Sequence, residues 1–395
     1  MTVDVTVVGG GIVGLSTAYN IVKTIPGIRL RLLEKECDVG RHQSTHNSGV
    51  LHAGLYYAPG SLKARLARAG LEQMIQFCRE YGIAHEQCGK MVVATSDDEV
   101  ARLRALFDRG TQNGLRDLRW LERDEIRRLE PHCGGFVGIH VPEEGIVDFG
   151  QVCATFRRLI ADGGGEIVFN ARVRAITRGR SDWTLHTGDR QYVSHRIVNC
   201  AGLYSDRVAS MAGERLDVKI VPFRGEYWML RPERRHLVTN LIYPVPDPTF
   251  PFLGVHFTRV IHGGIEAGPN AVLALAREGY RWRDVKISEL FESLAYPGLW
   301  KFLRHYPHAA AYEVARSLSK RLFVRSLQRL VPAVERRDLV AGPSGVRAQV
   351  MTRQGELVQD FHIVRGERAV HVINAPSPAA TASLAIGSEI AAMVV

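Results

Sequence analysis

The 395-residue chain has few cysteines, and none of its six forms a C-x-x-C pair or another metal-ligand spacing. This excludes the usual patterns of zinc and iron–sulfur sites, so we expect no metal centre and mostly buried free thiols. The chain also lacks an apolar run approaching the roughly 20 residues that span a bilayer. Internal repeats and low-complexity tracts are absent as well. These absences predict an ordinary globular protein, long enough for two domains.

Positive charge is in excess: 51 Lys and Arg against 41 Asp and Glu give a formal net charge of +10. Such an excess favours anionic partners, namely nucleic acid, acidic lipid or an acidic small molecule. The basic residues are scattered along the whole chain and show no nucleic-acid-binding module, so we predict no nucleic-acid partner. Because the first predicted strand begins at Val3, we expect no signal or transit peptide and a cytoplasmic location.

What the chain does contain is a glycine turn in a complete strand–turn–helix context. A buried strand is predicted at Val3–Val8, and it runs directly into Gly9-x-Gly11-x-x-Gly14. Apolar residues at helical spacing follow, and a second strand ends at Glu34. Glycines let the backbone approach a pyrophosphate, the helix N-terminus offers free N–H groups, and an acid about 20 residues further on can bind ribose hydroxyls. The pattern predicts a dinucleotide site.

Segments typical of nucleotide-binding domains recur at the start, middle and end of this α/β (α+β) chain. We predict a discontinuous nucleotide-binding domain, with a β-rich second domain inserted in pieces. The first comprises residues 1–87, 146–215 and 339–395, and the second comprises residues 88–145 and 216–338. A predicted strand that ends near Cys200 runs into a small-residue turn at Gly202, which we expect to approach the nucleotide. Residues 284–330 are predicted to be a basic helical segment.

Several longer strings are more specific than the glycine turn. They are His46–Tyr57 (HNSGVLHAGLYY), Val221–Trp228, Phe250–Arg259 (FPFLGVHFTR), Gly342–Gln349 (GPSGVRAQ) and Asn374–Gly387. Through them the chain resembles, over essentially its whole length, the glutathione-reductase-like flavoproteins of the D-amino-acid oxidase family, and within it the L-2-hydroxyglutarate dehydrogenase/oxidase branch. The resemblance implies a Rossmann-type FAD-binding domain with an inserted substrate domain, FAD as cofactor, and oxidation of (S)-2-hydroxyglutarate to 2-oxoglutarate.

Further residues are predicted to contact the FAD. Pro378, Ala379 and Ala380 open a predicted helix of small residues, whose free N–H groups would stabilise negative charge on a reduced flavin. The alternative is an ordinary proline-started helix. By the resemblance, the backbone of Val173 lies against the adenine. Small polar residues of a predicted loop suit the pyrophosphate and the flavin edge, or else form a hydrogen-bonded turn; they are Ser44, Thr45, Asn47 and Ser48.

The implied reaction needs a base for the C2 hydroxyl and cations for two carboxylates. His52 and His256 are the candidate bases, because each lies in one of the strings and histidine titrates near neutrality. The sequence leaves open which one acts. Arg347 and Arg259 are the leading substrate ligands, since a guanidinium binds a carboxylate bidentately. Secondary candidates, which equally suit a structural ion pair or a packed phenol, are Lys63, Tyr56 and Tyr57.

No second redox centre is indicated, so dioxygen or a membrane quinone is the expected electron acceptor. The amphipathic run 313–330 suggests peripheral contact with an anionic membrane, and we favour quinone. The alternative is a helix that packs its apolar stripe on its own domain. Other functions stay open: oxidation of another 2-hydroxy acid, an amino acid or a secondary amine; a flavin module acting on RNA; or a catalytically silent FAD-binding protein.

Overall fold

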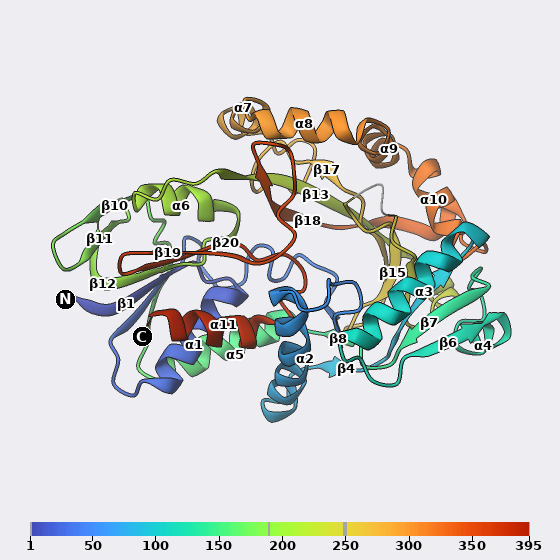
Figure 1. The fold of residues 1–395 in the computed structure, drawn as a ribbon, viewed down its shortest axis with the longest axis horizontal. Helices are drawn as coiled ribbons and strands as arrows, with labels where there is room; N and C mark the ends of the chain where they lie inside the picture. Colours follow the sequence, from blue (N-terminus) through green and yellow to red (C-terminus); the bar gives the residue numbers. More distant parts are fainter. Residues whose placement is uncertain (1, 189, 248–250, 395) are drawn as a thin grey trace.

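The computed structural model describes residues 2–188, 190–247 and 251–394. Two large sheets divide the molecule, one on the left and one on the right of Figure 1. Of the strings noted above, one begins at Phe250, which lies outside the described residues.

The first sheet has eight strands around a parallel core in the order β9, β2, β1, β12 and β20. The strand β1 (Val3–Val8) is central and is buried along almost its whole length, as expected for a parallel strand covered on both faces. The other strands of this sheet are β2 (Leu30–Leu33), β9 (Glu166–Val168), β10 (Ala175–Arg178), β11 (Trp183–His186), β12 (Gln191–Asn199), β19 (His362–Gly366) and β20 (Ala369–Asn374).

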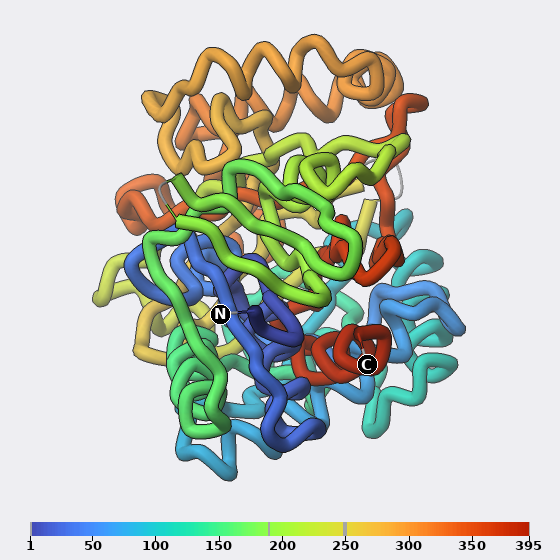
Figure 2. The backbone as a smooth tube through the Cα atoms, turned by 90° about the vertical axis from the view of Figure 1, so that its left-hand side faces the viewer, coloured from blue at the N-terminus to red at the C-terminus, as the bar shows by residue number. Residues whose placement is uncertain are grey.

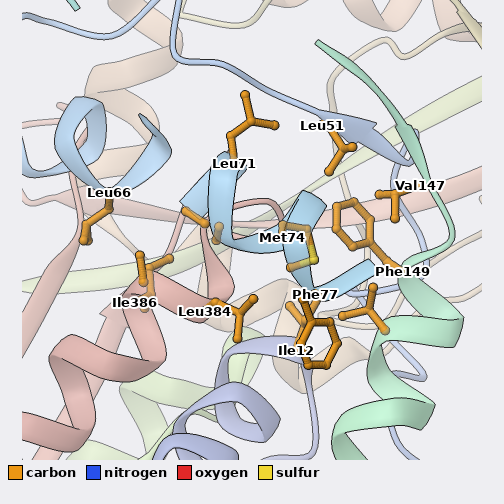
Figure 3. Close-up of a cluster of buried hydrophobic side chains, with 14 of the residues drawn as sticks. Ile12, Leu51, Leu66, Leu71, Met74, Phe77, Val147, Phe149, Leu384 and Ile386 are labelled. Carbon is orange, nitrogen blue, oxygen red and sulfur yellow. The ribbon is translucent and has the colours of Figure 1, made fainter. Parts of the chain in front are cut away.

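Helices from distant parts of the chain pack together beside this sheet. They are α1 (Ile12–Thr24), α2 (Leu62–Glu80), α5 (Phe149–Asp162) and α11 (Ser383–Val394), while α6 (Ser205–Met211) lies near β20 and β10. Figure 3 shows Met74 and Phe77 of α2 among side chains from the start and the end of the chain, including Ile12 and Leu384. α2 and the segment before α11 approach closely, because a Cβ on Gly70 would lie 2.4 Å from Ala382 Cα. The C-terminal segment therefore packs against the helices of the N-terminal part of the chain.

One predicted boundary in the C-terminal segment is wrong. The last helix begins at Ser383 instead of at Pro378–Ala380, because residues 377–382 form turns in which the Ala382 N–H donates to the Pro378 carbonyl. The prediction of mostly buried free thiols is confirmed, since four of the six free cysteines are buried: Cys78, Cys133, Cys153 and Cys200.

The second sheet has nine strands in the order β17, β13, β16, β15, β14, β5, β7 and β6, with β18 paired to β13. Their bounds are β5 (Lys90–Ala94), β6 (Arg119–Glu122), β7 (Val137–Val141), β13 (Val218–Leu230), β14 (Leu241–Pro244), β15 (His256–Arg259), β16 (Ile265–Gly268), β17 (Val272–Leu273) and β18 (Leu339–Thr352). Residues 339–352, which the sequence analysis grouped with the nucleotide-binding part, thus pair along their length with a strand of the other sheet.

Smaller elements complete the two halves. A three-stranded sheet joins β3 (Val50–Leu51), β8 (Gly145–Val147) and β4 (His85–Glu86). Helices α3 (Asp97–Gln112) and α4 (Arg123–Leu129) pack on the strands β5 to β7, and short 3-10 turns lie at Gly202–Tyr204, Pro232–Leu237 and Arg336–Asp338.

The predicted helical segment at 284–330 consists of four short helices; the first three lie in orange across the top of Figures 1 and 2, and the fourth lies lower, at the right of Figure 1. They are α7 (Ile287–Leu294), α8 (Pro297–His305), α9 (Pro307–Leu318) and α10 (Lys320–Gln328). The amphipathic run 313–330 is therefore broken at Ser319. Within α9, Arg316 is buried while Val314 and Leu318 are exposed, so the alternative, in which the run packs its apolar stripe on its own domain, does not hold for these two side chains. No helix in the described part of the chain is long and apolar enough to cross a membrane.

Candidate active site

A cavity of about 900 Å³ is lined by residues of both large sheets. At one end lie the glycine turn after β1 and the segment after β12, and at the other lie residues of β13, β14, β15 and β18. Its volume is within the range of sites for large organic ligands.

The glycine turn has the close contacts that its sequence predicts. Gly9 has a φ of +108°, and a Cβ there would lie 2.5 Å from the Cys200 carbonyl oxygen. Gly9 and Gly11 line the cavity. Gly14 is absent from the wall, because it lies where α1 crosses the strand end: a Cβ on Gly14 would fall 2.0 Å from the Gly9 oxygen. Gly14 therefore permits helix–strand packing instead of ligand contact.

Glu34 and Ser44 hold this end of the cavity together. The Glu34 carboxylate accepts the N–H groups of Gly10, at 2.6 Å, and of Glu36, at 2.8 Å. It is nearly buried and lines the cavity, and a carboxylate has further lone pairs for a ligand hydroxyl. Ser44 Oγ accepts the N–H of Ile12, the first residue of α1, at 2.8 Å. The free amide groups of the α1 N-terminus therefore face a polar loop.

The other predicted cofactor residues also divide into those that line the cavity and those that stabilise the protein around it. Those that line the cavity are Asn47, Ser48, Val173, Gly202, Pro378, Ala379 and Ala380. Thr45 is not among them, and its hydroxyl donates to the Gly40 carbonyl at 2.7 Å, which is a turn-stabilising role. The Asn47 amide also closes the loop, since it donates to the carbonyls of Gln43 and Ser44.

Both candidate bases line the cavity, in different surroundings. His52 follows β3, and its backbone N–H donates to Thr381 Oγ1 at 3.2 Å, which ties it to the turns before α11. Its Nδ1 lies 3.4 Å from Glu144 Oε2. His256, on β15, donates from Nδ1 to the Gly254 carbonyl at 2.9 Å. Burial lowers the pKa of His256 to about 3, so this imidazole is neutral in ordinary buffers.

Two cations and a phenol also line the cavity. The Nη1 of Arg347, on β18, donates to the Asn270 carbonyl at 3.1 Å. Lys63, at the start of α2, donates from Nζ to the Gln359 carbonyl at 3.2 Å, and burial lowers its pKa to about 8. The Tyr56 hydroxyl has no hydrogen-bond partner among the described residues, and burial raises its pKa. Tyr57 lines the cavity as well.

Among the predicted catalytic and substrate-binding residues, Arg259 is the one that does not line the cavity. Its side chain pairs with Glu86. The reason is strand geometry: Arg259 and His256 are three residues apart on β15, and side chains an odd number of residues apart point to opposite faces of a sheet. Arg224, on β13, is fully buried and pairs with Glu226 at 2.9 Å.

Sequence reasoning missed the two charged residues behind His52. Glu144 and Lys90 are both completely buried, and Lys90 Nζ lies 2.6 Å from Glu144 Oε2. The sequence did contain one indication of them. Lys90 is the first residue of the apolar strand KMVVA, and a lysine in a buried strand needs a charged partner.

A group of acidic and imidazole side chains lies at the cavity wall near the glycine turn. Glu36, His42 and Glu278 bring their ligand atoms within 4.8 Å of one another. The ammonium of Lys35 contacts Glu36 and lies 2.6 Å from the Glu278 carboxylate. Lys35 thus already offsets one of the two negative charges of the group.

Comparisons with known proteins agree with this architecture. A family model described as FAD dependent oxidoreductase matches residues 4–393. An L-2-hydroxyglutarate dehydrogenase of Indibacter alkaliphilus is 48% identical, with 99% of this chain and 98% of the relative covered. The enzyme of that name from Escherichia coli K12 is 44% identical, over 99% and 93% of the two chains. The human mitochondrial enzyme of that name is 41% identical, over 98% and 88%.

Solved structures show the same fold. L-alpha-glycerophosphate oxidase from Mycoplasma pneumoniae, with FAD bound, superposes with a TM-score of 0.81 at 20% identity, covering 100% of this chain and 95% of the other. Glycine oxidase from Geobacillus kaustophilus gives 0.75 at 20% identity, covering 100% and 94%.

The cavity fits FAD on its own geometry. The glycine turn leaves no room for a Cβ beside the Cys200 carbonyl, amide groups of the α1 N-terminus are near, and the volume admits a dinucleotide. With the family model and the relatives, these features establish that the chain belongs to the FAD-dependent oxidoreductase family, in the group of its L-2-hydroxyglutarate dehydrogenases.

Proposed function

We propose that the protein oxidises (S)-2-hydroxyglutarate to 2-oxoglutarate with FAD, in the 900 Å³ cavity. The observation that carries the proposal is that His52, His256, Arg347 and Lys63 line the same cavity as the glycine turn. Two cations match the two carboxylates of the substrate, and two imidazoles are available for its hydroxyl. The names of the relatives that are 41–48% identical point to the same substrate.

Each side chain has a distinct role in this proposal. Arg347 and Lys63 bind the carboxylates, and the neutral Tyr56 hydroxyl donates a further hydrogen bond. One histidine accepts the C2 hydroxyl proton, while bound FAD supplies the acceptor for the hydride from C2. Arg259 has no part, because it faces away and pairs with Glu86.

We assign the cofactor contacts by the position of each lining residue. Gly9, Gly11 and the α1 N-terminus face the pyrophosphate, Glu34 the ribose and Val173 the adenine. The remaining contacts are assigned to the flavin end; they are Asn47, Ser48, Gly202, Pro378, Ala379 and Ala380.

For the electron acceptor we propose a quinone, reached through peripheral contact with an anionic membrane. The support is the exposed surface of α7, α8 and α9, here called the α7–α9 face. Its large apolar side chains include Ile287, 81% exposed, Phe291, 71% exposed, and Leu318, 71% exposed. Lysine and arginine residues of the same segment, such as Lys286 and Lys301, suit anionic headgroups.

Flotation with anionic liposomes at low salt tests this contact. We expect the protein to float, and the variant Ile287→Ser/Phe291→Ser to remain at the bottom of the gradient, because it loses the side chains that enter the bilayer. Leu129→Ser, which changes an exposed leucine on α4, is the control and should float. Wild-type protein that stays at the bottom contradicts the membrane proposal.

The substrate is tested by anaerobic mixing of the flavoprotein with a panel of small molecules. We expect rapid loss of flavin absorbance with (S)-2-hydroxyglutarate, and 2-oxoglutarate as the product. Malate, glycerol 3-phosphate, D-alanine and sarcosine should leave the flavin oxidised on the same time scale. Faster bleaching by any of these four would replace the proposed substrate by the corresponding hydroxy acid, alcohol or amine.

A further inference from the structure

Three charged or polar side chains form a buried row that ends at the cavity. Lys90 Nζ lies 2.6 Å from Glu144 Oε2, and His52 Nδ1 lies 3.4 Å from the same oxygen. The other carboxylate oxygen of Glu144 accepts the Ala53 N–H at 3.1 Å, which orients the carboxylate. Lys90 and Glu144 are fully buried, whereas 20% of the His52 side chain is exposed and lines the cavity.

The row has no alternative partners. Among the described residues, His52 Nδ1 and Lys90 Nζ have no hydrogen-bond partner, and the ion-pair contact that each makes is with Glu144 Oε2. Burial alone would raise the pKa of Glu144, but the charges of Lys90 and His52 outweigh it and lower this pKa to about 2. Glu144 is therefore an anion, and a neutral His52 next to it carries its proton on Nδ1. That tautomer leaves the lone pair on Nε2.

We propose that His52 is the base of the reaction and that Glu144 and Lys90 are its positioning residues. This inference rests on the proposed function. As the C2–H bond breaks and hydride passes to bound FAD, the hydroxyl proton passes to His52 Nε2 and the O–H bonding electrons form the new carbonyl. The resulting imidazolium faces Glu144, which stabilises it as the acid of a catalytic triad stabilises its histidine.

The positive charge of Lys90 limits how strongly Glu144 stabilises the protonated form of His52. Without a cation, a buried Glu144 would hold His52 as an imidazolium before substrate arrives. The Lys90 ammonium is also surrounded by the rings of Tyr56, at 4.5 Å, and Tyr243, at 5.1 Å. Burial, and then the charges of His52, Arg347 and Lys90, lower the pKa of His256. Hence His256 has no anion to stabilise a proton, and His52 has one.

The pH dependence of flavin reduction in single turnovers tests the role of Glu144. In Glu144→Gln the imidazolium loses its anion, so we expect the acidic limb of the profile to move to lower pH by about 1 unit. The plateau rate should fall about 100-fold. Glu143→Gln, whose side chain pairs with Arg68 outside the row, is the control and should match wild type. A slower Glu144→Gln enzyme with an unmoved limb would mean a structural role and would overturn the proposal.

Lys90→Met gives the opposite shift, because Glu144 then acts on His52 without compensation. Its acidic limb should move to higher pH, and a shift to lower pH contradicts the role given to Lys90.

Nitrogen NMR of histidine-labelled wild-type holoenzyme, with His52→Asn for assignment, needs no substrate. It should show neutral His52 protonated on Nδ1, and protonation on Nε2 would overturn the inference. If the protein shows this tautomer but its flavin is not reduced by (S)-2-hydroxyglutarate, the result contradicts the proposed function and leaves the arrangement of His52 and Glu144 intact.

Discussion

The imidazole of His256 stacks on the phenol ring of Tyr243, with the ring centroids 3.8 Å apart and the planes inclined by 19°. Its Nδ1 donates to the Gly254 carbonyl, so a neutral His256 keeps its lone pair on Nε2. Burial lowers the pKa of His256 to about 3. The two histidines of the cavity thus differ in kind: His256 is fixed and neutral, and His52 faces a carboxylate.

The substitution His256→Asn should therefore weaken substrate binding without changing the pH profile. We expect KM to rise about 10-fold, because the shorter side chain removes part of the cavity wall, a loss of about 1.4 kcal/mol in substrate binding. The acidic limb of kcat/KM should stay in place between pH 5 and 8, because a group with a pKa of about 3 does not titrate there. A limb displaced in His256→Asn but unchanged in His52→Asn would assign the base to His256.

Arg347 should be sensitive even to a substitution that keeps its charge. Arg347→Lys loses the forked guanidinium geometry, and we expect KM for 2-hydroxyglutarate to rise about 100-fold. Arg353→Lys, just beyond the end of β18 and exposed, is the control and should behave as wild type. Steady-state kinetics with an artificial acceptor measures both. An unchanged KM in Arg347→Lys would exclude bidentate binding by this residue.

Lys63 should make substrate capture fall at alkaline pH. Burial lowers its pKa to about 8, so its ammonium is present below that pH and is lost as the pH rises through it. We expect kcat/KM, which reports ionisations of the free enzyme, to decline through about pH 8. In Lys63→Arg the decline should disappear, because a guanidinium stays charged. A decline that persists in this variant would have to come from another group.

Glu266 gives a stability prediction that is independent of the substrate. Burial raises its pKa to about 7, above the value near 4.5 of the unfolded chain. The folded protein therefore binds this proton more tightly, and the free energy of unfolding falls as pH rises from 4.5 to 7. Glu266→Gln should be more stable than wild type by about 3 kcal/mol at pH 8, with the gain shrinking toward pH 5.

Thermal unfolding of the holoenzymes across this pH range measures the difference. Glu233→Gln, an exposed site, should show no such pH-dependent gain. Equal melting temperatures for wild type and Glu266→Gln at pH 8 would show that Glu266 is not held protonated by burial.

The nucleotide end of the cavity could be predicted from the sequence because its signals are local. Gly9, Gly11 and Glu34 stand within one strand–helix–strand unit, and all three line the cavity. The exclusion of Arg259 could also have been predicted from the sequence. Side chains of a strand alternate between its two faces, so His256 and Arg259 cannot both face one cavity from the regular strand β15.

The row behind His52 could not be predicted in the same way. Glu144 lies in a turn next to the small third sheet, and Lys90 begins β5 of another sheet. Their meeting depends on how the sheets pack, which no local pattern encodes. The exposed Val314 and Leu318 are a similar case, because amphipathic spacing identifies two faces of a helix but not the one that turns inward.

The central claim is that this cavity presents C2 of one enantiomer of a diacid to FAD. Anaerobic stopped-flow mixing of the flavoprotein with each enantiomer of 2-hydroxyglutarate tests it most directly. The account predicts full bleaching of the flavin by the (S) form within seconds and none by the (R) form. Flavin that keeps its colour with (S)-2-hydroxyglutarate, or that both enantiomers bleach equally fast, would contradict it.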